Sequence, residues 1–334
     1  MSAVPDHGGS LARAEALFPQ APQPWIDLST GINPHAYPFS PLPATAFSRL
    51  PEPAQTVKLA RLAAQAYGVA EPACVVCGPG TQILLPLVMQ LVEPGRAAVL
   101  SPTYAEHARA ARLAGHAVGE PDTFDALYGA DLAVVVNPNN PDGRVIARER
   151  LLDLAEHLRR KGGLLVVDEA FMEVGPQEQS VAGDVGSDGL LVLRSFGKFF
   201  GLAGVRLGFV LAERPRADRL SAQLGPWAVS GPTLHIAQEA LGDDGWKAAM
   251  RQQLAEEADR LDALLVACGL EVAGGTNLFR YVRSPHASAL FQVLGSRGIL
   301  VRPFGFDANV LRIGLPADDS AFMRLEAALR AFVA

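Results

Sequence analysis

Six short apolar runs, spread through the first two thirds of the chain, constrain the fold more than any other feature of the sequence. Stretches with helical spacing, such as residues 147–162, lie between them. Runs this short and this apolar fit strands buried on both faces, with helices covering the sheet. The sequence therefore predicts an α/β fold with a mostly parallel central sheet. The runs are ACVVC, AAVLS, DLAVVVN, GLLVVDEA, GLLVLRSF and VRLGFVLA.

Composition divides the chain into three parts. Residues 1–45 are rich in Pro, Gly and Ser, which predicts an irregular N-terminal arm packing with the small domain. Residues 46–225 contain the apolar runs and predict the large domain. Residues 226–334 combine a long helical stretch with the strand-like segments LFRYVR, GILVRPF and VLRIGLP, which predicts a smaller α+β domain.

Charge and hydropathy exclude several classes of partner. The 334 residues are 49% hydrophobic, enough for more than one domain, and carry a formal net charge of -6. Nucleic acids and anionic membranes need clustered cationic surface, so we expect neither as a partner. The start lacks a signal-peptide pattern and no apolar run is long enough to span a bilayer, which favours a cytoplasmic protein. Three cysteines predict neither a disulfide framework nor a metal site.

Two ionisable residues come at or just after buried strands. Lys198 follows the run LLVLR, and a lysine there loses charge by desolvation, leaving a neutral amine that attacks aldehydes. Asp168 ends the run LLVVD, where a carboxylate needs a cation or donors, and a protonated pyridine nitrogen would serve. Taken alone, each has a structural alternative: a solvated lysine, and an acid that caps a turn.

Two turns carry polar groups at strand ends. Gly78-Pro-Gly80-Thr81 opens an apolar helical stretch, and a glycine turn at a helix start binds anions through backbone N–H groups. It matches neither the Walker pattern nor the dinucleotide fingerprint. The second turn, Asn-Pro-Asn-Asn140-Pro-Asp-Gly, is ordinary turn chemistry by itself.

The order of these motifs is more specific than any one of them. The glycine turn is followed by an aromatic Tyr104, the Asn-Pro-Asn-Asn-Pro-x-Gly turn, Asp-Glu-Ala, Ser-x-x-Lys, an Arg eight positions later and a late Leu-Arg-Ile. Over nearly the whole chain this succession resembles the fold type I pyridoxal-5'-phosphate (PLP) enzymes of the aspartate aminotransferase superfamily. The resemblance implies a PLP-dependent transferase-like fold, PLP as cofactor and a homodimer.

The resemblance also implies a role for each cofactor residue. Lys198 would hold PLP as a Schiff base and move protons, and Asp168 would keep the pyridine nitrogen protonated. Asn140 would hydrogen-bond the phenolic oxygen of the ring, Tyr104 would stack on one face and Ala170 would pack against the other. The residues expected at the cofactor phosphate are Gly80, Thr81, Ser195 and Arg206.

Details near the start resemble one branch of this superfamily, decarboxylases of L-threonine O-3-phosphate in cobalamin biosynthesis. They include a His-Gly-Gly motif and the stretch DLSTGINP. This resemblance implies conversion of a small phosphorylated amino acid to (R)-1-amino-2-propanol O-2-phosphate. Residues that bind the phosphate would leave the carboxylate free to stand perpendicular to the ring and depart as CO2. The expected substrate residues are His7, Gly8, Asn33, Arg302 and Arg312.

Three other interpretations remain open. A histidinol-phosphate-like aminotransferase would share the cofactor motifs, and only the arm and Phe171, which replaces a tyrosine of many aminotransferases, favour decarboxylation. A non-catalytic PLP-fold binding protein would not require the complete cofactor set with its lysine. A nicotinamide dehydrogenase would need a glycine fingerprint and a downstream acid that this sequence lacks.

Overall fold

The computed structural model describes residues 7–333, which divide into two compact units. The large unit comprises residues 36–139 and 145–248. The small unit comprises the described residues up to 35, the turn 140–144 and the residues from 249 onward. These boundaries differ from the expected divisions after residues 45 and 225.

Packing explains both differences. Residues 36–45 group with the large unit because Tyr37 packs there: its backbone N–H donates to Phe200 O (2.9 Å) and its hydroxyl to Asp243 Oδ2 (3.2 Å). The stretch after residue 225 begins with helix α9 (Gly231–Gly242), which packs on α3 (Pro53–Tyr67) of the large unit. Packing of α9 on α3 therefore places residues 231–242 in the large unit, and the composition of the sequence gives no sign of this packing.

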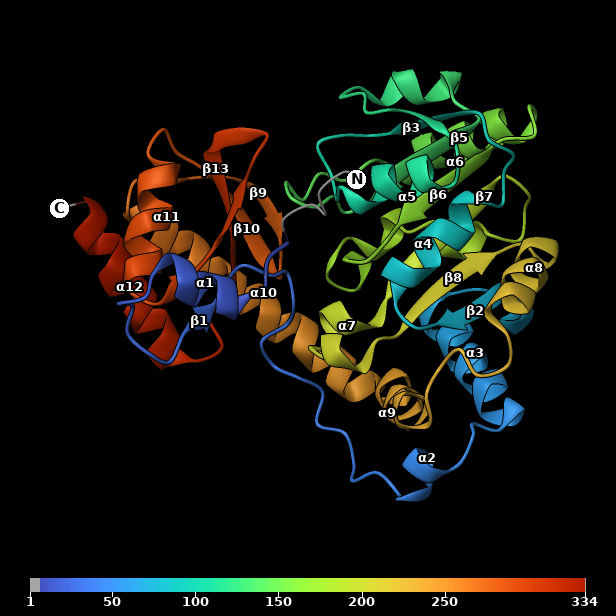
Figure 1. The fold of residues 1–334 in the computed structure, drawn as a ribbon, viewed down its shortest axis with the longest axis horizontal. Coiled ribbons are helices and arrows are strands. Elements are labelled where there is room, and N and C mark those ends of the chain that lie inside the picture. Colours follow the sequence, from blue (N-terminus) through green and yellow to red (C-terminus); the bar gives the residue numbers. More distant parts are fainter. Residues whose placement is uncertain (1–6, 334) are drawn as a thin grey trace. The chain divides into compact units, whose positions relative to one another are not determined.

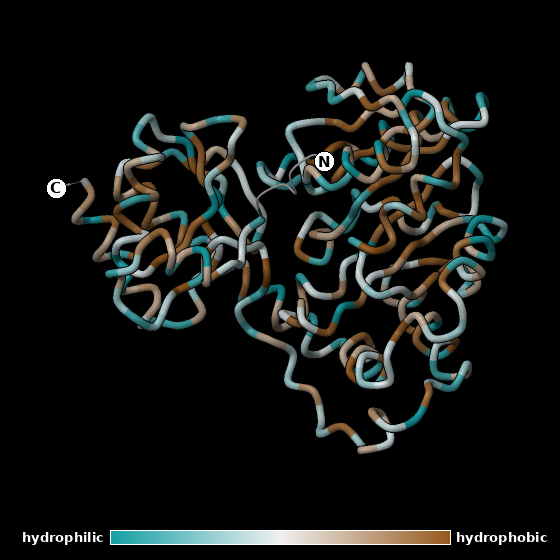
Figure 2. Tube along the Cα trace, viewed as in Figure 1, coloured by the Kyte–Doolittle hydropathy of each residue, from teal (hydrophilic) through white to brown (hydrophobic). Residues whose placement is uncertain are grey.

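A seven-stranded, mostly parallel sheet forms the centre of the large unit, as the apolar runs predict (Figure 1). Its strand order is β2-β8-β7-β6-β5-β3-β4, and only β8 runs antiparallel to its neighbours. Hydrophobic residues follow these strands (Figure 2). The strands are β2 (Val75–Gly78), β3 (Arg96–Val99), β4 (Ala117–Gly119), β5 (Leu132–Val136), β6 (Leu164–Asp168), β7 (Leu190–Ser195) and β8 (Gly208–Ala212).

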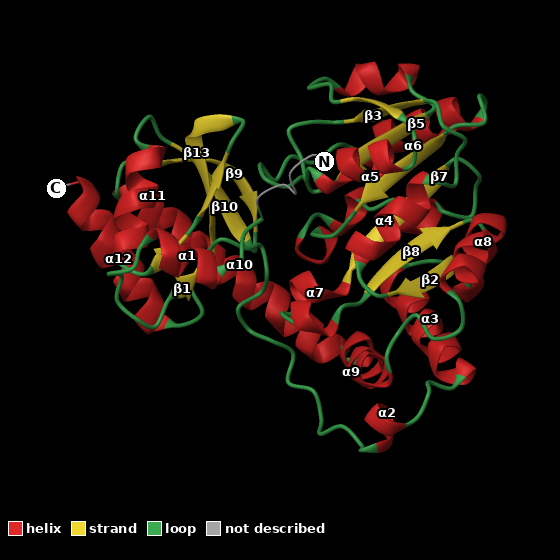
Figure 3. Ribbon diagram, viewed as in Figure 1, coloured by secondary structure: helices red, strands yellow, loops and turns green. Residues whose placement is uncertain are grey.

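Alternate residues of the central strands face different helices. Val134, Val166 and Leu193 share one buried core with helices α4, α5 and α8, whereas residues such as Val167 and Val192 are equally buried on the opposite face. Helices α3 and α6 also pack on strands of this sheet, whereas α2 lies apart from it and packs on α9 (Figure 3). The α-helices not yet given are α2 (Thr45–Ser48), α4 (Thr81–Met89), α5 (Glu106–Leu113), α6 (Arg148–Arg159), α7 (Phe196–Phe199) and α8 (Arg214–Leu224).

Six short 3-10 helices lie in the connections of the large unit. They are η1 (Pro72–Cys74), η2 (Phe124–Gly129), η3 (Met172–Val174), η4 (Gln177–Gln179), η5 (Ala182–Asp184) and η6 (Ala203–Val205). The first follows α3 and leads into β2, and the third and sixth follow the polar ends of β6 and β7. The segments around η3 and η6 therefore continue directly from the strand ends that carry the predicted site residues.

The small unit contains a four-stranded antiparallel sheet of order β12-β13-β10-β9. Helix α11 packs on β13 and on α12. The long helix α10 begins in the large unit and continues into the small one. The elements are α1 (Leu11–Leu17), β1 (Ile26–Asp27), α10 (Asp244–Ala267), β9 (Glu271–Thr276), β10 (Phe279–Arg283), α11 (Ala287–Ser296), β11 (Ile299–Leu300), β12 (Arg302–Phe304), β13 (Asp307–Gly314) and α12 (Asp319–Val333).

The N-terminal arm is fixed to the small unit by backbone hydrogen bonds. Strand β1 pairs in parallel with β11, and Leu28 N–H donates to Leu300 O (2.8 Å). On its other side, Leu28 O accepts from Gly314 N–H (2.7 Å) at the end of β13. The arm therefore joins two strands and is part of the unit's core. Within residues 7–333 no helix combines the length and apolarity that crossing a membrane requires.

Candidate active site

The predicted site residues form two sets, one in each unit, and Asn140 belongs to the small unit. The large unit carries the other residues expected at the cofactor. The small unit carries the residues expected at the substrate.

Gly80 and Arg206 lie close together at the start of α4. Gly80 is the N-cap of this nine-residue helix at a φ of 90°, and a Cβ there would lie 2.8 Å from Arg206 Nη2. Only glycine lets the guanidinium come this close to the helix start. Arg206 itself has a φ of 55°, an uncommon conformation for a residue other than glycine. Exposed N–H groups and a guanidinium together bind phosphate oxygens.

Ser195 and Thr81 join the same arrangement through β8. Ser195, the last residue of β7, pairs with Gly208 of β8. A Cβ at Gly208 would lie 2.6 Å from the backbone nitrogen of Thr81, so the strand start and the helix start are in direct contact. The structure therefore brings together the four residues expected at a phosphate, namely Gly80, Thr81, Ser195 and Arg206.

Lys198 lies in the short helix α7 directly after β7, and its Nζ is 5.9 Å from the ring centroid of Phe171. Its neighbours in the sequence are buried phenylalanines. Phe196 stacks on Phe200 with ring centroids 4.5 Å apart, and Phe200 stacks on Trp246 at 5.7 Å. These rings fix the backbone that carries Lys198, which is itself only partly buried.

Asp168 ends β6 and is 6% exposed. Its Oδ1 accepts from Ala170 N–H (3.0 Å), and its Oδ2 is 2.9 Å from His107 Nε2. His107 is fully buried in α5, and with the proton on Nε2 it donates to the carboxylate. This contact fixes the orientation of the Asp168 carboxylate.

Sequence reasoning missed His107, and its one signal is its position three residues after Tyr104, at the helical spacing that places two side chains together. The two rings meet edge to face with centroids 5.8 Å apart. The Tyr104 hydroxyl donates to Gln82 Oε1 (2.8 Å), whose amide nitrogen donates to Glu106 Oε2 (2.5 Å). Helices α4 and α5 therefore fix the ring that was expected to stack on the cofactor.

Arg312 is the centre of the small-unit set. It is 7% exposed, its Nη1 donates to Asn140 Oδ1 (2.5 Å) and its Nη2 to Ser29 O (2.6 Å). Because the Asn140 oxygen accepts this bond, the amide nitrogen is the group that remains to donate elsewhere. Its sequence neighbour Asp142 O would lie 2.1 Å from a Cβ at Gly274, so the turn packs on β9 without intervening side chains.

A second arginine stands beside the first. Arg302 of β12 pairs in register with Arg312 of β13, so both side chains leave the same face of the sheet. Burial, and next the positive charge of Arg302, lower the pKa of Arg312 to about 9, while Asp27 opposes this shift. The group stays cationic at neutral pH, and the positive charges of two neighbouring arginines favour an anion beside them.

The N-terminal arm supplies the backbone oxygen that binds Arg312. A Cβ at Gly8 would lie 2.4 Å from Ser29 O, the oxygen that also accepts from Arg312. Gly9 N–H donates to Ser29 Oγ (2.7 Å), and Asp27 Oδ1 accepts from the N–H (2.9 Å) and the hydroxyl (2.6 Å) of Ser29. Ser29 is a second residue that the sequence did not single out.

His7 and Asn33 are the other two side chains expected at the substrate. His7 is exposed at the start of the described chain. Asn33 is 2% exposed, and its Oδ1 accepts from His35 N–H (2.8 Å), which closes a local turn. A substrate contact by either side chain stays a prediction, whereas Gly8 packs directly on the residue that holds Arg312.

The fold and the two sets define a class of protein. The chain belongs to the aminotransferase class I and II family, whose sequence model matches residues 45–328. Within that class the chain is 45% identical to threonine-phosphate decarboxylase of Pseudomonas aeruginosa over 98% of each chain, and 44% identical to that of a Sinorhizobium species, also over 98% of each. Histidinol-phosphate aminotransferase of Serratia proteamaculans is 32% identical over 81% of this chain and 80% of the relative.

Solved structures share the fold. Histidinol-phosphate aminotransferase from Sinorhizobium meliloti, solved in complex with pyridoxal-5'-phosphate, superposes with a TM-score of 0.83 at 20% identity, covering 99% of this chain and 95% of that one. L-threonine-O-3-phosphate decarboxylase from Porphyromonas gingivalis superposes with a TM-score of 0.76 at 21% identity, covering 92% and 98%. The expected α/β, PLP-dependent transferase-like fold is confirmed.

Proposed function

We propose that this protein is a PLP-dependent lyase that converts L-threonine O-3-phosphate to (R)-1-amino-2-propanol O-2-phosphate and CO2, for cobalamin biosynthesis. The observation that carries the proposal is the Arg302–Arg312 pair. Arg312 donates to Ser29 O in the arm, and Gly8 packs against the same oxygen. Full-length identity of 45% to a threonine-phosphate decarboxylase supports it, against 32% to a histidinol-phosphate aminotransferase.

The large-unit residues fit PLP. The glycine at Gly80 leaves open the space beside Arg206 that a side chain would fill, where a phosphate needs donors. Asp168, oriented by His107, supplies a buried carboxylate for a pyridinium nitrogen, and Lys198 supplies the amine that binds the aldehyde. When bound, PLP supplies an electron sink that stabilises negative charge at the substrate Cα.

The small-unit residues would select the reaction by binding the substrate phosphate. A phosphate carries close to two negative charges at neutral pH, which matches the two guanidiniums of Arg302 and Arg312. With the phosphate bound by these arginines, the carboxylate would have no arginine of this pair to hold it and would be free to leave as CO2. The bond from Cα to the carboxylate breaks, CO2 leaves, and a proton delivered from Lys198 Nζ to Cα completes the product.

The direct test is product analysis with purified protein, PLP and L-threonine O-3-phosphate. We expect stoichiometric CO2 release and a phosphorylated amino alcohol of R configuration. Robust amino transfer from histidinol phosphate to 2-oxoglutarate without CO2 release from threonine phosphate would favour the aminotransferase alternative. A Lys198→Ala variant should lose the yellow colour that borohydride bleaches in the wild type, and retention of that colour would contradict the assignment of Lys198.

We also propose that the protein is a cytoplasmic homodimer. Large apolar side chains are exposed on the large unit at Phe47 (69%), Leu50 (64%) and Trp227 (57%), and a partner subunit could cover them. The family resemblance supports a dimer. Sedimentation equilibrium of the wild type should give twice the 35.3 kDa chain mass, and a monomer that retains full activity would contradict the proposal.

A further inference from the structure

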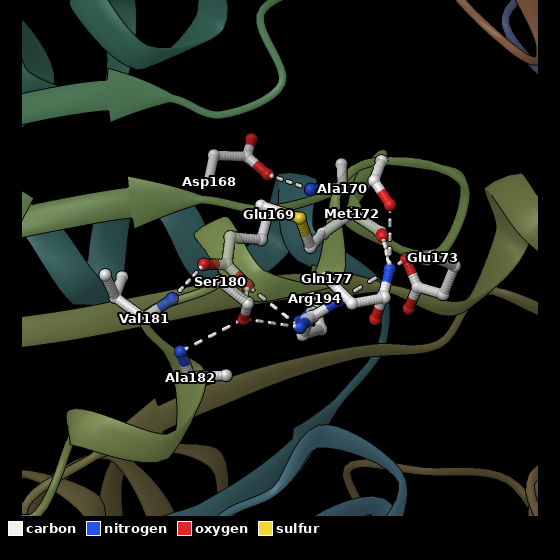
Figure 4. Close-up of polar contacts among 11 residues, drawn as sticks. Asp168, Glu169, Ala170, Met172, Glu173, Gln177, Ser180, Val181, Ala182 and Arg194 are labelled. Carbon is white, nitrogen blue, oxygen red and sulfur yellow. Dashed lines mark hydrogen bonds and ion pairs between the residues drawn. The ribbon is translucent and has the colours of Figure 1, made fainter. Parts of the chain in front are cut away.

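A buried ionic cluster lies in the large unit, and none of its members is among the predicted site residues (Figure 4). Arg194 is 2% exposed, Glu169 is 0% exposed and Glu173 is 5% exposed. Arg194 Nη2 lies 2.9 Å from Glu169 Oε2, and Arg194 Nη1 lies 3.6 Å from Glu173 Oε2. The guanidinium also covers the ring of Tyr67 at 4.7 Å.

Stability alone is a weak explanation for such a cluster. Removing a charge from water costs several kcal/mol, and apolar residues of similar volume often replace buried ion pairs without loss of stability. The cluster holds two carboxylates for one guanidinium. Accordingly, burial raises the pKa of Glu169, with Arg194 opposing, and burial followed by the charge of Glu173 raises the pKa of Tyr67. The position of the cluster offers a better explanation.

Arg194 and Glu169 stand next to the cofactor residues in the sequence but on the opposite face of the sheet. Asp168 of β6 pairs with Leu193 of β7, and Glu169 N–H donates to Leu193 O (2.9 Å). Because side chains alternate along a strand, Asp168 and Ser195 face the core of α4 and α5, whereas Glu169 and Arg194 face away from it. Figure 4 shows the Asp168 carboxylate directed away from Arg194.

Glu169 and Glu173 also stand at the two ends of a short segment that contains Ala170, a residue expected at the cofactor. Residues 169–173, here called the 169–173 turn, begin with one carboxylate of the cluster and end with the other. Between them lie Ala170, expected to pack against the cofactor, and Phe171, whose ring centroid is 5.9 Å from Lys198 Nζ. Glu169 is further fixed by Ser180 Oγ (2.7 Å) and Val181 N–H (2.8 Å), so the start of the turn is anchored on three sides.

We propose that Arg194 is a positioning residue for the cofactor. By binding Glu169 and Glu173 it fixes both ends of the 169–173 turn, and it thereby orients the Asp168 carboxylate and the Ala170–Phe171 surface for the ring of PLP. Arg194 touches neither cofactor nor substrate. The inference rests on the proposed binding of PLP and needs no assumption about which substrate is used.

The test compares Glu173→Gln and Arg194→Lys with the wild type. Each apoprotein is titrated with PLP, the visible absorbance of each holoprotein is followed against pH, and urea unfolding of the apoproteins reports stability. We expect both variants to bind PLP about tenfold more weakly, which corresponds to about 1.4 kcal/mol. We also expect the midpoint of the absorbance titration to shift, because the carboxylate facing the pyridine nitrogen is displaced.

Asp184→Asn is the matched control. It breaks the Arg148–Asp184 pair (2.6 Å) in the same unit without touching the 169–173 turn, so PLP affinity and the absorbance midpoint should stay at wild-type values. Lower urea stability of Glu173→Gln and Arg194→Lys with both cofactor measurements unchanged would overturn the inference, as would equal effects of Asp184→Asn. If Arg194→Lys does not fold, Glu173→Gln decides. A wild-type protein that bound no PLP would instead contradict the proposed function itself.

Discussion

Arg312 is held by oxygen atoms from two distant parts of the chain, Ser29 O and Asn140 Oδ1. The planar guanidinium donates to these two oxygens from two different nitrogens, and a lysine has only one nitrogen in its side chain. We therefore expect Arg312→Lys to raise KM for L-threonine O-3-phosphate roughly 100-fold, because a buried, hydrogen-bonded charge contact is lost. Steady-state kinetics with the phosphorylated substrate, and inhibition by inorganic phosphate, measure the effect.

The control for Arg312 is Arg283→Lys in the same sheet. Arg283 pairs with Asp307 at 3.2 Å and is 46% exposed, so its replacement should leave KM unchanged. Phosphate inhibition should weaken only in Arg312→Lys. An equal rise of KM in both variants would mean that general damage to the small unit, and not loss of an anion site, explains the result.

His107 donates to a buried carboxylate, and hydrogen bonds to charged groups contribute about 1.5–3 kcal/mol. We expect His107→Gln to weaken PLP binding by about tenfold or more, since the Asp168 carboxylate loses the donor that orients it. Fluorescence titration of the apoprotein gives the dissociation constant. His157→Gln on the exposed face of α6 should bind PLP like the wild type, and a similar loss there would argue against a specific role for His107.

Ionisable residues at the ends of buried strands could be predicted as site residues from the sequence, but the residues that contact them could not. Lys198 and Asp168 stand out because each is ionisable and comes at or just after a buried strand, and the ordered motifs then imply their roles. His107 and Ser29 look ordinary where they occur. Their importance appears only when the fold brings them to Asp168 and Arg312, which are 61 and 283 residues away in the chain.

Among the elements, strands with apolar runs were predicted, and three others, β1, β4 and β9, were missed. Strand β1 has only two residues and lies in an arm rich in Pro, Gly and Ser. The three-residue β4 lies at the edge of the large sheet with exposed residues, so it lacks the apolar signal. Strand β9 contains Gly274 and Gly275, residues that disfavour strands in general. The long helical stretch after residue 226 is divided into α9 and α10 at Asp243, whose carboxylate accepts from Trp246 N–H (2.9 Å).

The turn of residues 140–144 packs against the two glycines of β9, and substitution of a glycine in the turn tests this contact. Gly143 has a φ of 74°, and a Cβ there would lie 1.9 Å from Gly275 O. Gly269 has a φ of 70° with nothing within 4 Å, so it carries the same backbone penalty without a clash. We expect Gly269→Ala to cost about 1 kcal/mol and Gly143→Ala about 1–3 kcal/mol more, with loss of decarboxylation.

Urea unfolding and the CO2 assay distinguish the two glycine variants. The difference between them isolates the contact with Gly275, because the backbone conformation is matched. Equal losses of stability, together with equal activity, would show that the Asn140 turn does not depend on close packing against β9.

The buried thiol of Cys77 in β2 should make the free energy of unfolding depend on pH in the alkaline range. Burial raises its pKa from 9.0 to about 12. Above pH 9 the unfolded chain releases this proton while the folded chain keeps it, so stability falls as pH rises through the window from 9 to about 12. At about pH 10.5 the loss relative to about pH 8 should be about 2 kcal/mol from this group.

Urea unfolding of the wild type, Cys77→Ser and Cys77→Val at both pH values tests this expectation. The two variants should differ from each other in absolute stability because their packing differs. They should agree in losing about 2 kcal/mol less than the wild type between the two conditions. A wild type that loses no more than the variants would mean that the thiol does not titrate as its burial requires.

For the molecule as a whole, the sequence predicts a larger and a smaller part divided after residues 45 and 225, whereas the two compact units of the structure divide the chain at other positions. A five-residue turn, 140–144, belongs to the small unit although both of its flanks belong to the large one. No composition signal marks such a turn, because Asn, Pro, Asp and Gly occur in turns everywhere. Only the contacts of Asn140 with Arg312 and of Gly143 with Gly275 assign it.

The discontinuous turn has a consequence for exchanging parts between relatives. The chain passes from one unit to the other after residues 35, 139, 144 and 248, so neither unit corresponds to one continuous gene segment. A chimera that received only the C-terminal segment of a relative would combine a foreign Arg312 with the native Ser29 and Asn140, its two hydrogen-bond acceptors. Transfer of substrate preference would therefore require moving the arm, the 140–144 turn and the C-terminal segment together.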